Sequence, residues 1–145
     1  MRINGEWSVG LDRVSRPMVC TSVRDQSGTP REVVFLVDTG ADQTVLDFDT
    51  YLKLGLESTP NSGIELEGVG GTTSSVVVDS QIRFLRDDGG IVVFNAEILA
   101  FTEPTSLGMN VLGRDILRFF AVIVDAESKA VCLLREPHHY VIQES

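Results

Sequence analysis

The segment Val33-Val34-Phe35-Leu36-Val37-Asp38-Thr39-Gly40 is the stretch of this chain that says most about its fold. Five apolar residues, typical of a buried strand, stop abruptly at a carboxylate, a hydroxyl and a glycine. A buried carboxylate without partners is costly, so an aspartate in this place is usually paired or hydrogen-bonded, and such groups often mark functional sites. The alternative is an ordinary strand-end turn, because Asp, Thr and Gly are all turn residues.

Two further segments bear on this choice. Glu67-Gly68-Val69-Gly70-Gly71-Thr72 lies between two strand-like runs, and its glycines predict a hairpin tip that bends freely. This tip is either a plain Gly-rich loop or a flap that closes over a ligand. Asn110-Val111-Leu112-Gly113-Arg114-Asp115-Ile116-Leu117 runs from apolar residues through a glycine and a charged pair into a helix-like stretch. Taken alone, it is a strand-to-helix turn with solvated charges.

Together and in this order, the three segments resemble the retroviral-type (retropepsin-like) aspartic proteases. Residues 35–46 resemble their active-site strand and loop, residues 68–71 their flap tip, and residues 111–117 the apolar-apolar-Gly motif and the helix that follows. The resemblance extends over residues 30–135. It implies an all-β fold: a closed acid-protease barrel with a Gly-rich flap hairpin, one or two short helices and one lobe per chain. A single domain is expected over residues 1–145, with its core at about 9–135.

The resemblance also implies roles for individual residues. The catalytic segment would be Asp38, Thr39 and Gly40, with Thr39 holding two such loops together across a dimer axis. Arg114 would orient Asp42 through its planar, bidentate guanidinium, and Gly113 would support the same loop. The residues implied to contact substrate are Ala41, Asp42, Gly68, Val69, Gly70 and Gly71.

Aspartic protease chemistry needs two neighbouring carboxylates that share one proton. The sequence contains one Asp-Thr-Gly, and no second copy follows the Val-Leu-Gly segment. The site is therefore expected to be assembled from two chains, with the Asp38 of each at a two-fold axis. The expected activity is that of an aspartic endopeptidase on extended peptide segments, which would bind like an added strand.

Two other functions stay open at this point. One is a dimeric peptide-binding module on the same fold without efficient proteolysis, because a fold alone does not settle function. The other is a phosphoryl-transfer enzyme with Asp38 as nucleophile, although the Mg²⁺ and α/β surroundings of such sites do not suit a β-rich pattern.

Composition limits the partners. The net charge of −9, from 12 basic and 21 acidic residues, argues against nucleic acid and anionic membrane surfaces. No apolar stretch approaches the roughly 18 residues of a membrane helix, and the start lacks a secretory apolar region, so a cytoplasmic location is the default expectation. No cofactor is expected. His138 and His139 are read as solvated tail residues, with a metal site as the alternative.

Local signals predict several elements. Residues 9–14 and 18–23 are expected to form a hairpin that turns at residues 15–17. Asp47 is a helix N-cap for residues 48–54, and Gly55 closes that helix. The remaining expectations are a strand at 32–37, a turn at 87–90, a helix at 113–119, a hairpin of 120–124 with 130–134, and a tail at 140–142 that is either a dimer strand or frayed.

Overall fold

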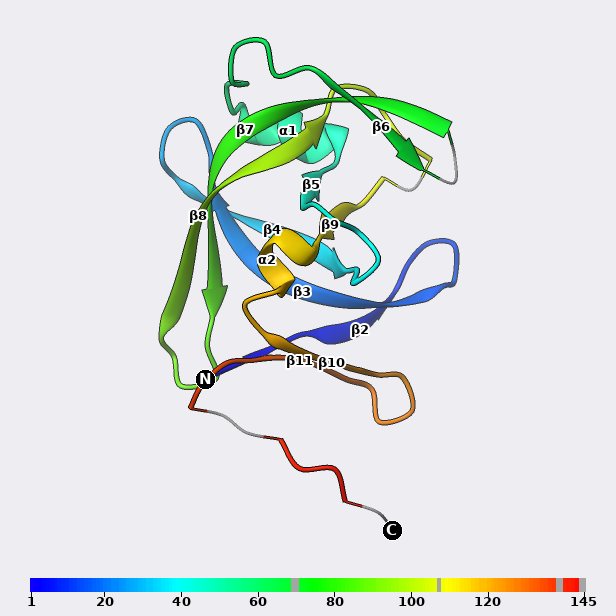
Figure 1. Cartoon of the computed structure of the whole chain (residues 1–145), viewed down its shortest axis with the longest axis vertical. Coiled ribbons are helices and arrows are strands. Elements are labelled where there is room, and N and C mark those ends of the chain that lie inside the picture. The colour runs from blue at the N-terminus through cyan, green and yellow to red at the C-terminus, as the bar shows by residue number, and fades with distance from the viewer. Residues whose placement is uncertain (69–70, 107, 138–139, 144–145) are drawn as a thin grey trace.

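The structure, a computed structural model, describes residues 1–68, 71–106, 108–137 and 140–143. Strands dominate these residues, which confirms the all-β prediction (Figure 1). The elements are β1 (Arg2–Asn4), β2 (Glu6–Val9), β3 (Ser15–Arg24), β4 (Pro30–Val37), β5 (Val45–Leu46), α1 (Phe48–Leu54), β6 (Ile64–Gly68), β7 (Gly71–Leu85), β8 (Ile91–Phe101), β9 (Asn110–Leu112), α2 (Arg114–Leu117), β10 (Ala121–Asp125) and β11 (Ala130–Leu134). No helix in the described part of the chain has the length and hydropathy needed to cross a bilayer.

The larger sheet closes on itself. Its eight strands run in the order β2-β3-β4-β9-β5-β8-β7-β6, and β3 also pairs with β7 through Ser22↔Arg83 and Val23↔Ile82. This extra pairing joins β3, β4, β9, β5, β8 and β7 into a ring and leaves β2 and β6 outside it. Closure of a sheet removes exposed strand edges, which is the arrangement expected of a small barrel.

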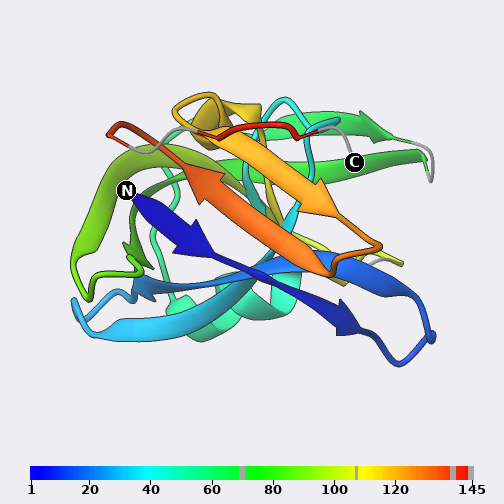
Figure 2. The ribbon, with the colours of Figure 1, turned by 90° about the horizontal axis from the view of Figure 1, so that it is seen from below.

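A second sheet is formed by the ends of the described chain. β1, β11 and β10 lie side by side in it, as Figure 2 shows from below. The indole of Trp7 on β2 links this sheet to the barrel, because its Nε1 donates to the Asp125 carbonyl oxygen at 2.9 Å. Ile3 of β1 is buried in the common core, so the N-terminal strand is part of the packed structure.

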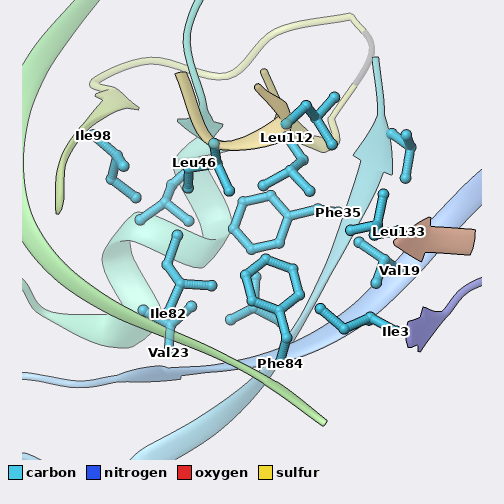
Figure 3. Packing of buried hydrophobic residues seen from close by; sticks show 14 of the residues in the cluster. Ile3, Val19, Val23, Phe35, Leu46, Ile82, Phe84, Ile98, Leu112 and Leu133 are labelled. Atoms are coloured by element: carbon cyan, nitrogen blue, oxygen red, sulfur yellow. The ribbon is translucent and has the colours of Figure 1, made fainter. Parts of the chain in front are cut away.

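The core lies inside the ring. Along β4, Val33, Phe35 and Val37 are buried and alternate with more exposed neighbours, as the two-residue period of a strand requires. Figure 3 shows Leu46 of β5 and Leu112 of β9 pointing toward the ring of Phe35. Each such buried side chain stabilises the fold by about 1.5–3 kcal/mol. The three strands that lead into the Asp38 region are therefore fixed by shared core packing.

Most local predictions are confirmed. α1 begins where Asp47 Oδ1 accepts a hydrogen bond from Thr50 N at 2.6 Å, and it ends at Gly55, which has the left-handed φ of 61°. In the β7–β8 turn, Asp88 Oδ1 accepts from Gly90 N at 2.9 Å. The last hairpin forms as β10 and β11, one residue later at its start than expected.

A hairpin forms at the N-terminus as predicted, but from β2 and β3, and residues 9–14, which were expected to be its first strand, are mostly its turn. The chain turns at residues 10–14, because Asp12 Oδ1 accepts from Val14 N at 3.1 Å and Asp12 Oδ2 binds Arg16 Nη2 at 2.5 Å. Pro17 lies inside β3, opposite Trp7. Pairing of β3 with β4 begins only at Met18, so the missing N–H of the proline costs that ladder nothing.

Acid should destabilise two turns, the one at Asp12 and the one at Asp25, whose backbone N–H groups bind these carboxylates. Hydrogen bonds from Ser27 and then Arg31 hold the pKa of Asp25 well below its usual range, and the Arg16 hydrogen bond lowers the pKa of Asp12 to about 2. A carboxyl whose pKa is lowered by folding stabilises the protein above its unfolded pKa of about 3.9 and loses that contribution as pH falls through the folded value. We expect the unfolding free energy, measured by urea denaturation, to fall below about pH 4. Asp25→Asn should flatten that fall, and identical pH profiles for the two proteins would contradict the prediction.

Candidate active site

The candidate site is a loop, residues 38–44, that connects β4 to β5 across the end of β9. β9 lies between these two strands in the sheet, parallel to β4 through Val37↔Leu112 and antiparallel to β5 through Val45↔Val111. α2 follows β9 directly. Loop 38–44 and the start of α2 are therefore brought together, although about 70 residues separate them in the chain.

Two hydrogen bonds hold Asp38 at the start of this loop. Its N–H donates to the Leu112 carbonyl oxygen at 3.2 Å, and its Oδ1 accepts from Gly40 N at 2.9 Å. A Cβ on Gly40 would lie 3.2 Å from that same carboxylate oxygen, so a side chain there would crowd it. Asp38 is half-buried, whereas Thr39 and Gly40 are exposed. The carboxylate is thus oriented and still accessible.

The first N–H groups of α2 are capped by the loop. Arg114 N donates to the Ala41 carbonyl oxygen at 2.9 Å, and Asp115 N donates to the Asp42 carbonyl oxygen at 3.1 Å. The first N–H groups of a helix have no partner within the helix, so these bonds satisfy groups that would otherwise need water. The sequence predicted a helix over residues 113–119, but α2 spans only Arg114–Leu117.

Gly113 allows this close contact. A Cβ at this position would lie 2.4 Å from the backbone carbonyl carbon of Gln43, a distance that side chains do not tolerate. The φ of Gly113 is −95°, so glycine is needed here for space and not for an unusual backbone conformation.

The structure brings Arg114 and Asp42 together as expected. Arg114 Nη2 and Asp42 Oδ1 form an ion pair on the surface of the loop. The side chains remain 59% and 80% exposed, and ion pairs in such positions contribute little because water and salt screen them. The contact is present, while its importance for activity stays a prediction.

Sequence reasoning missed a second and more shielded contact, between Thr44 and Asp115. The Thr44 hydroxyl donates to Asp115 Oδ1 at 2.7 Å and accepts from Gly113 N at 3.0 Å. Thr44 N also donates to Asp115 Oδ2 at 3.0 Å, and the Thr44 side chain is 0% exposed. The pattern gave only a weak signal, because a threonine before a strand and an aspartate in a charged pair are common features.

The expected flap region is described in part. β6 and β7 form an antiparallel hairpin whose last described pair is Gly68↔Gly71. Figure 1 shows this hairpin at the end of the molecule opposite the chain termini. Val69 and Gly70, two residues implied to contact substrate, lie outside the described residues, as do the two residues of the metal alternative, His138 and His139.

Comparison with known proteins identifies the family. A family model described as an aspartyl protease matches residues 23–116, a span that contains the Asp38 loop, the β6–β7 hairpin and the start of α2. The chain belongs to the aspartyl protease family. It is a peptide-bond hydrolase of the aspartic type, and the resemblance to retropepsins is confirmed. No curated protein matches the chain.

Two solved structures place this aspartyl protease among the retropepsin-like folds. The chain is similar to EIAV protease, solved in complex with the inhibitor HBY-793, at 27% identity over 77% of this chain and 91% of that one, with a TM-score of 0.52. It is also similar to a retropepsin-like aspartic protease from Rickettsia conorii, at 17% identity over 92% of this chain and 89% of that one, with a TM-score of 0.53. The second likeness concerns the fold alone.

Replacing Gly113 by alanine should separate α2 from the loop. The added methyl group would meet the Gln43 backbone, so we expect Gly113→Ala to lower the unfolding free energy by about 1–3 kcal/mol, as overpacked sites do. Urea denaturation measures this. The matched control is Gly63→Ala, whose Cβ would have no heavy atom within 4 Å. Equal stabilities of the two variants would contradict the close-packing argument.

Proposed function

We propose that this aspartyl protease is a homodimeric endopeptidase whose site is completed by the Asp38 of a second chain. The proposal rests on the single copy of Asp-Thr-Gly and on its exposure in one chain. The motif occurs once in the sequence, and Thr39 and Gly40 are exposed instead of packed against the lobe that holds them. A two-fold partner would cover this exposed motif with its own copy and supply the second carboxylate.

In this proposal the two Asp38 carboxyl groups share one proton. The ionised group takes a proton from a water molecule, which attacks the scissile carbonyl carbon, while the protonated group donates a hydrogen bond to the carbonyl oxygen. The tetrahedral intermediate then breaks its C–N bond as a proton passes to the leaving amine. The Gly40 N–H, which binds Asp38 Oδ1, would keep that carboxylate in place throughout.

The substrate is proposed to bind as an extended peptide. Among the described residues, β6 is the last strand of the large sheet, and its outer edge would accept an added strand. The β6–β7 hairpin, with its glycines at residues 68–71, would act as the flap that closes over the peptide, and Ala41 and Asp42 would line its subsites. We further propose that the chain is one domain and that the apolar tail residues 140–142, which are exposed in the single chain, contribute to the dimer.

A peptide library tests the proposed chemistry. The wild type, at a concentration high enough to dimerise, should cleave peptides somewhere between about pH 3 and 8 with a bell-shaped profile. Asp38→Asn should lower kcat/KM by about 10³-fold or more. Asp79→Asn, an exposed carboxylate on β7, is the matched control and should remain active. Cleavage by neither wild type nor Asp38→Asn would favour the peptide-binding module instead.

Mixing of chains tests the two-chain site. When the wild type re-equilibrates with a threefold excess of Asp38→Asn chains, random pairing should reduce the activity per wild-type chain to about one quarter. The loss arises because most wild-type chains then pair with a chain that lacks the acid. Activity is measured after dilution from a denaturant. In the control, Asp79→Asn chains are added instead, and the activity per chain that carries Asp38 should not change. Unchanged activity per wild-type chain would rule out a shared site.

A further inference from the structure

We propose that Thr44 and Asp115 form a positioning pair that sets the orientation of the Asp38 loop, so that the rate of catalysis depends on a contact that does not touch the substrate. The inference rests on the proposed function for its kinetic consequence. Its structural basis is independent of that function, because it concerns how one loop is held by one helix.

The pair is joined by unusually many hydrogen bonds for its size. The Asp115 carboxylate accepts from the Thr44 hydroxyl at 2.7 Å, from Thr44 N at 3.0 Å and from Ile116 N at 2.9 Å. The Thr44 hydroxyl also accepts from Gly113 N at 3.0 Å. Thr44 and Gly113 are buried and Asp115 is half-buried, so water replaces these bonds poorly once they are lost.

The contact can reach Asp38 because both ends of the loop are held by the same short unit, β9 with α2. At its start, Asp38 N donates to the Leu112 carbonyl oxygen at 3.2 Å. In its middle, the Ala41 carbonyl oxygen accepts from Arg114 N at 2.9 Å. At its end, Thr44 binds Asp115. Releasing the Thr44 end frees α2 to shift, and any shift of Arg114 or Leu112 moves the backbone that holds the carboxylate.

A small displacement has a large kinetic effect in this type of site. A reacting group that is misplaced by about 1 Å loses about 100-fold in rate, because attack requires near-ideal geometry. In the proposed dimer the defect occurs twice, once in each chain. The proposed flap contacts with the substrate lie outside this loop, and of the proposed subsite residues only Ala41 and Asp42 move with it. The loss should therefore fall mainly on kcat and change KM by no more than about threefold.

The experiment compares two substitutions at one position. Thr44→Val keeps the shape but removes the hydroxyl, and Thr44→Ser keeps the hydroxyl. We expect Thr44→Val to lower kcat about 10- to 100-fold with KM within about threefold, and Thr44→Ser to stay within about threefold of wild type. Asp115→Ala should resemble Thr44→Val, because it removes the acceptor of both the Thr44 hydroxyl and the Thr44 N–H. The pH profile of Thr44→Val should also change shape, because the two carboxylates no longer hold their spacing.

Two further measurements separate positioning from loss of stability. Val23→Ala, in the core strand β3, serves as a variant destabilised away from the loop, and its kcat well below its Tm should equal that of wild type. Amide hydrogen exchange of Asp38 and Arg114, whose N–H groups bind Leu112 and Ala41, should accelerate more in Thr44→Val than in Val23→Ala or Thr44→Ser.

These measurements distinguish failure of the positioning pair from failure of the proposed function. Wild-type kcat and wild-type exchange in Thr44→Val would overturn the positioning pair, and so would an equal loss of kcat in Val23→Ala. If the wild type cleaves nothing, the proposed function fails. The exchange of Asp38 and Arg114 in the Thr44 variants still shows whether this pair holds the loop, and unaltered exchange would overturn it.

Discussion

The contact between Gly113 and the Gln43 backbone is the constraint on which the rest of the site depends. A Cβ there would come within 2.4 Å of the loop, so α2 begins against the loop only because residue 113 has no side chain. This approach lets the loop carbonyls cap the helix and brings the Thr44 hydroxyl to the Gly113 amide. The barrel, in turn, makes the approach possible, because Phe35 and its neighbours fix β4, β5 and β9 side by side.

Besides the backbone hydrogen bonds, two side-chain pairs of the described residues join α2 to the loop, and they differ in strength. The Arg114–Asp42 pair is mostly exposed, and such pairs contribute about 0–1 kcal/mol. In the bonds between Thr44 and Asp115, the acceptor is a carboxylate and the Thr44 side chain is buried away from water. Hydrogen bonds to charged groups contribute about 1.5–3 kcal/mol each. The Arg114–Asp42 ion pair, which the sequence predicted, is thus the weaker of the two contacts. The threonine and the aspartate together hold the loop more firmly.

The sequence predicts local features, such as helix caps and turns, that residues close together in the chain determine. The cap Asp47, the closing Gly55 and the glycines of the β7–β8 turn act within a few residues, and the structure agrees with each. The N-terminal turn was misplaced because a side chain, Asp12, decides it by binding Arg16, whereas Pro17 looks like the turn residue and lies in a strand. The roles of Asp38, Thr39 and Gly40 came from a resemblance and stay a prediction. The Thr44–Asp115 contact was not foreseen, because nothing in the spacing of two polar residues 71 positions apart says that they meet.

The way β9 inserts between β4 and β5 has a consequence for how the enzyme matures. The bonds that tie the loop to β9 and α2 span sequence separations of 69 to 74 residues, so they close only after most of the chain has collapsed. Contacts of this kind form late in folding, since the entropy of a long closed loop must be overcome first. During synthesis, the Asp-Thr-Gly segment therefore exists long before the helix that fixes it. In the proposed enzyme, a nascent chain would carry Asp38 before its loop has the geometry for catalysis, so chain topology, in addition to the need for a second chain, would withhold activity from the partly folded polypeptide.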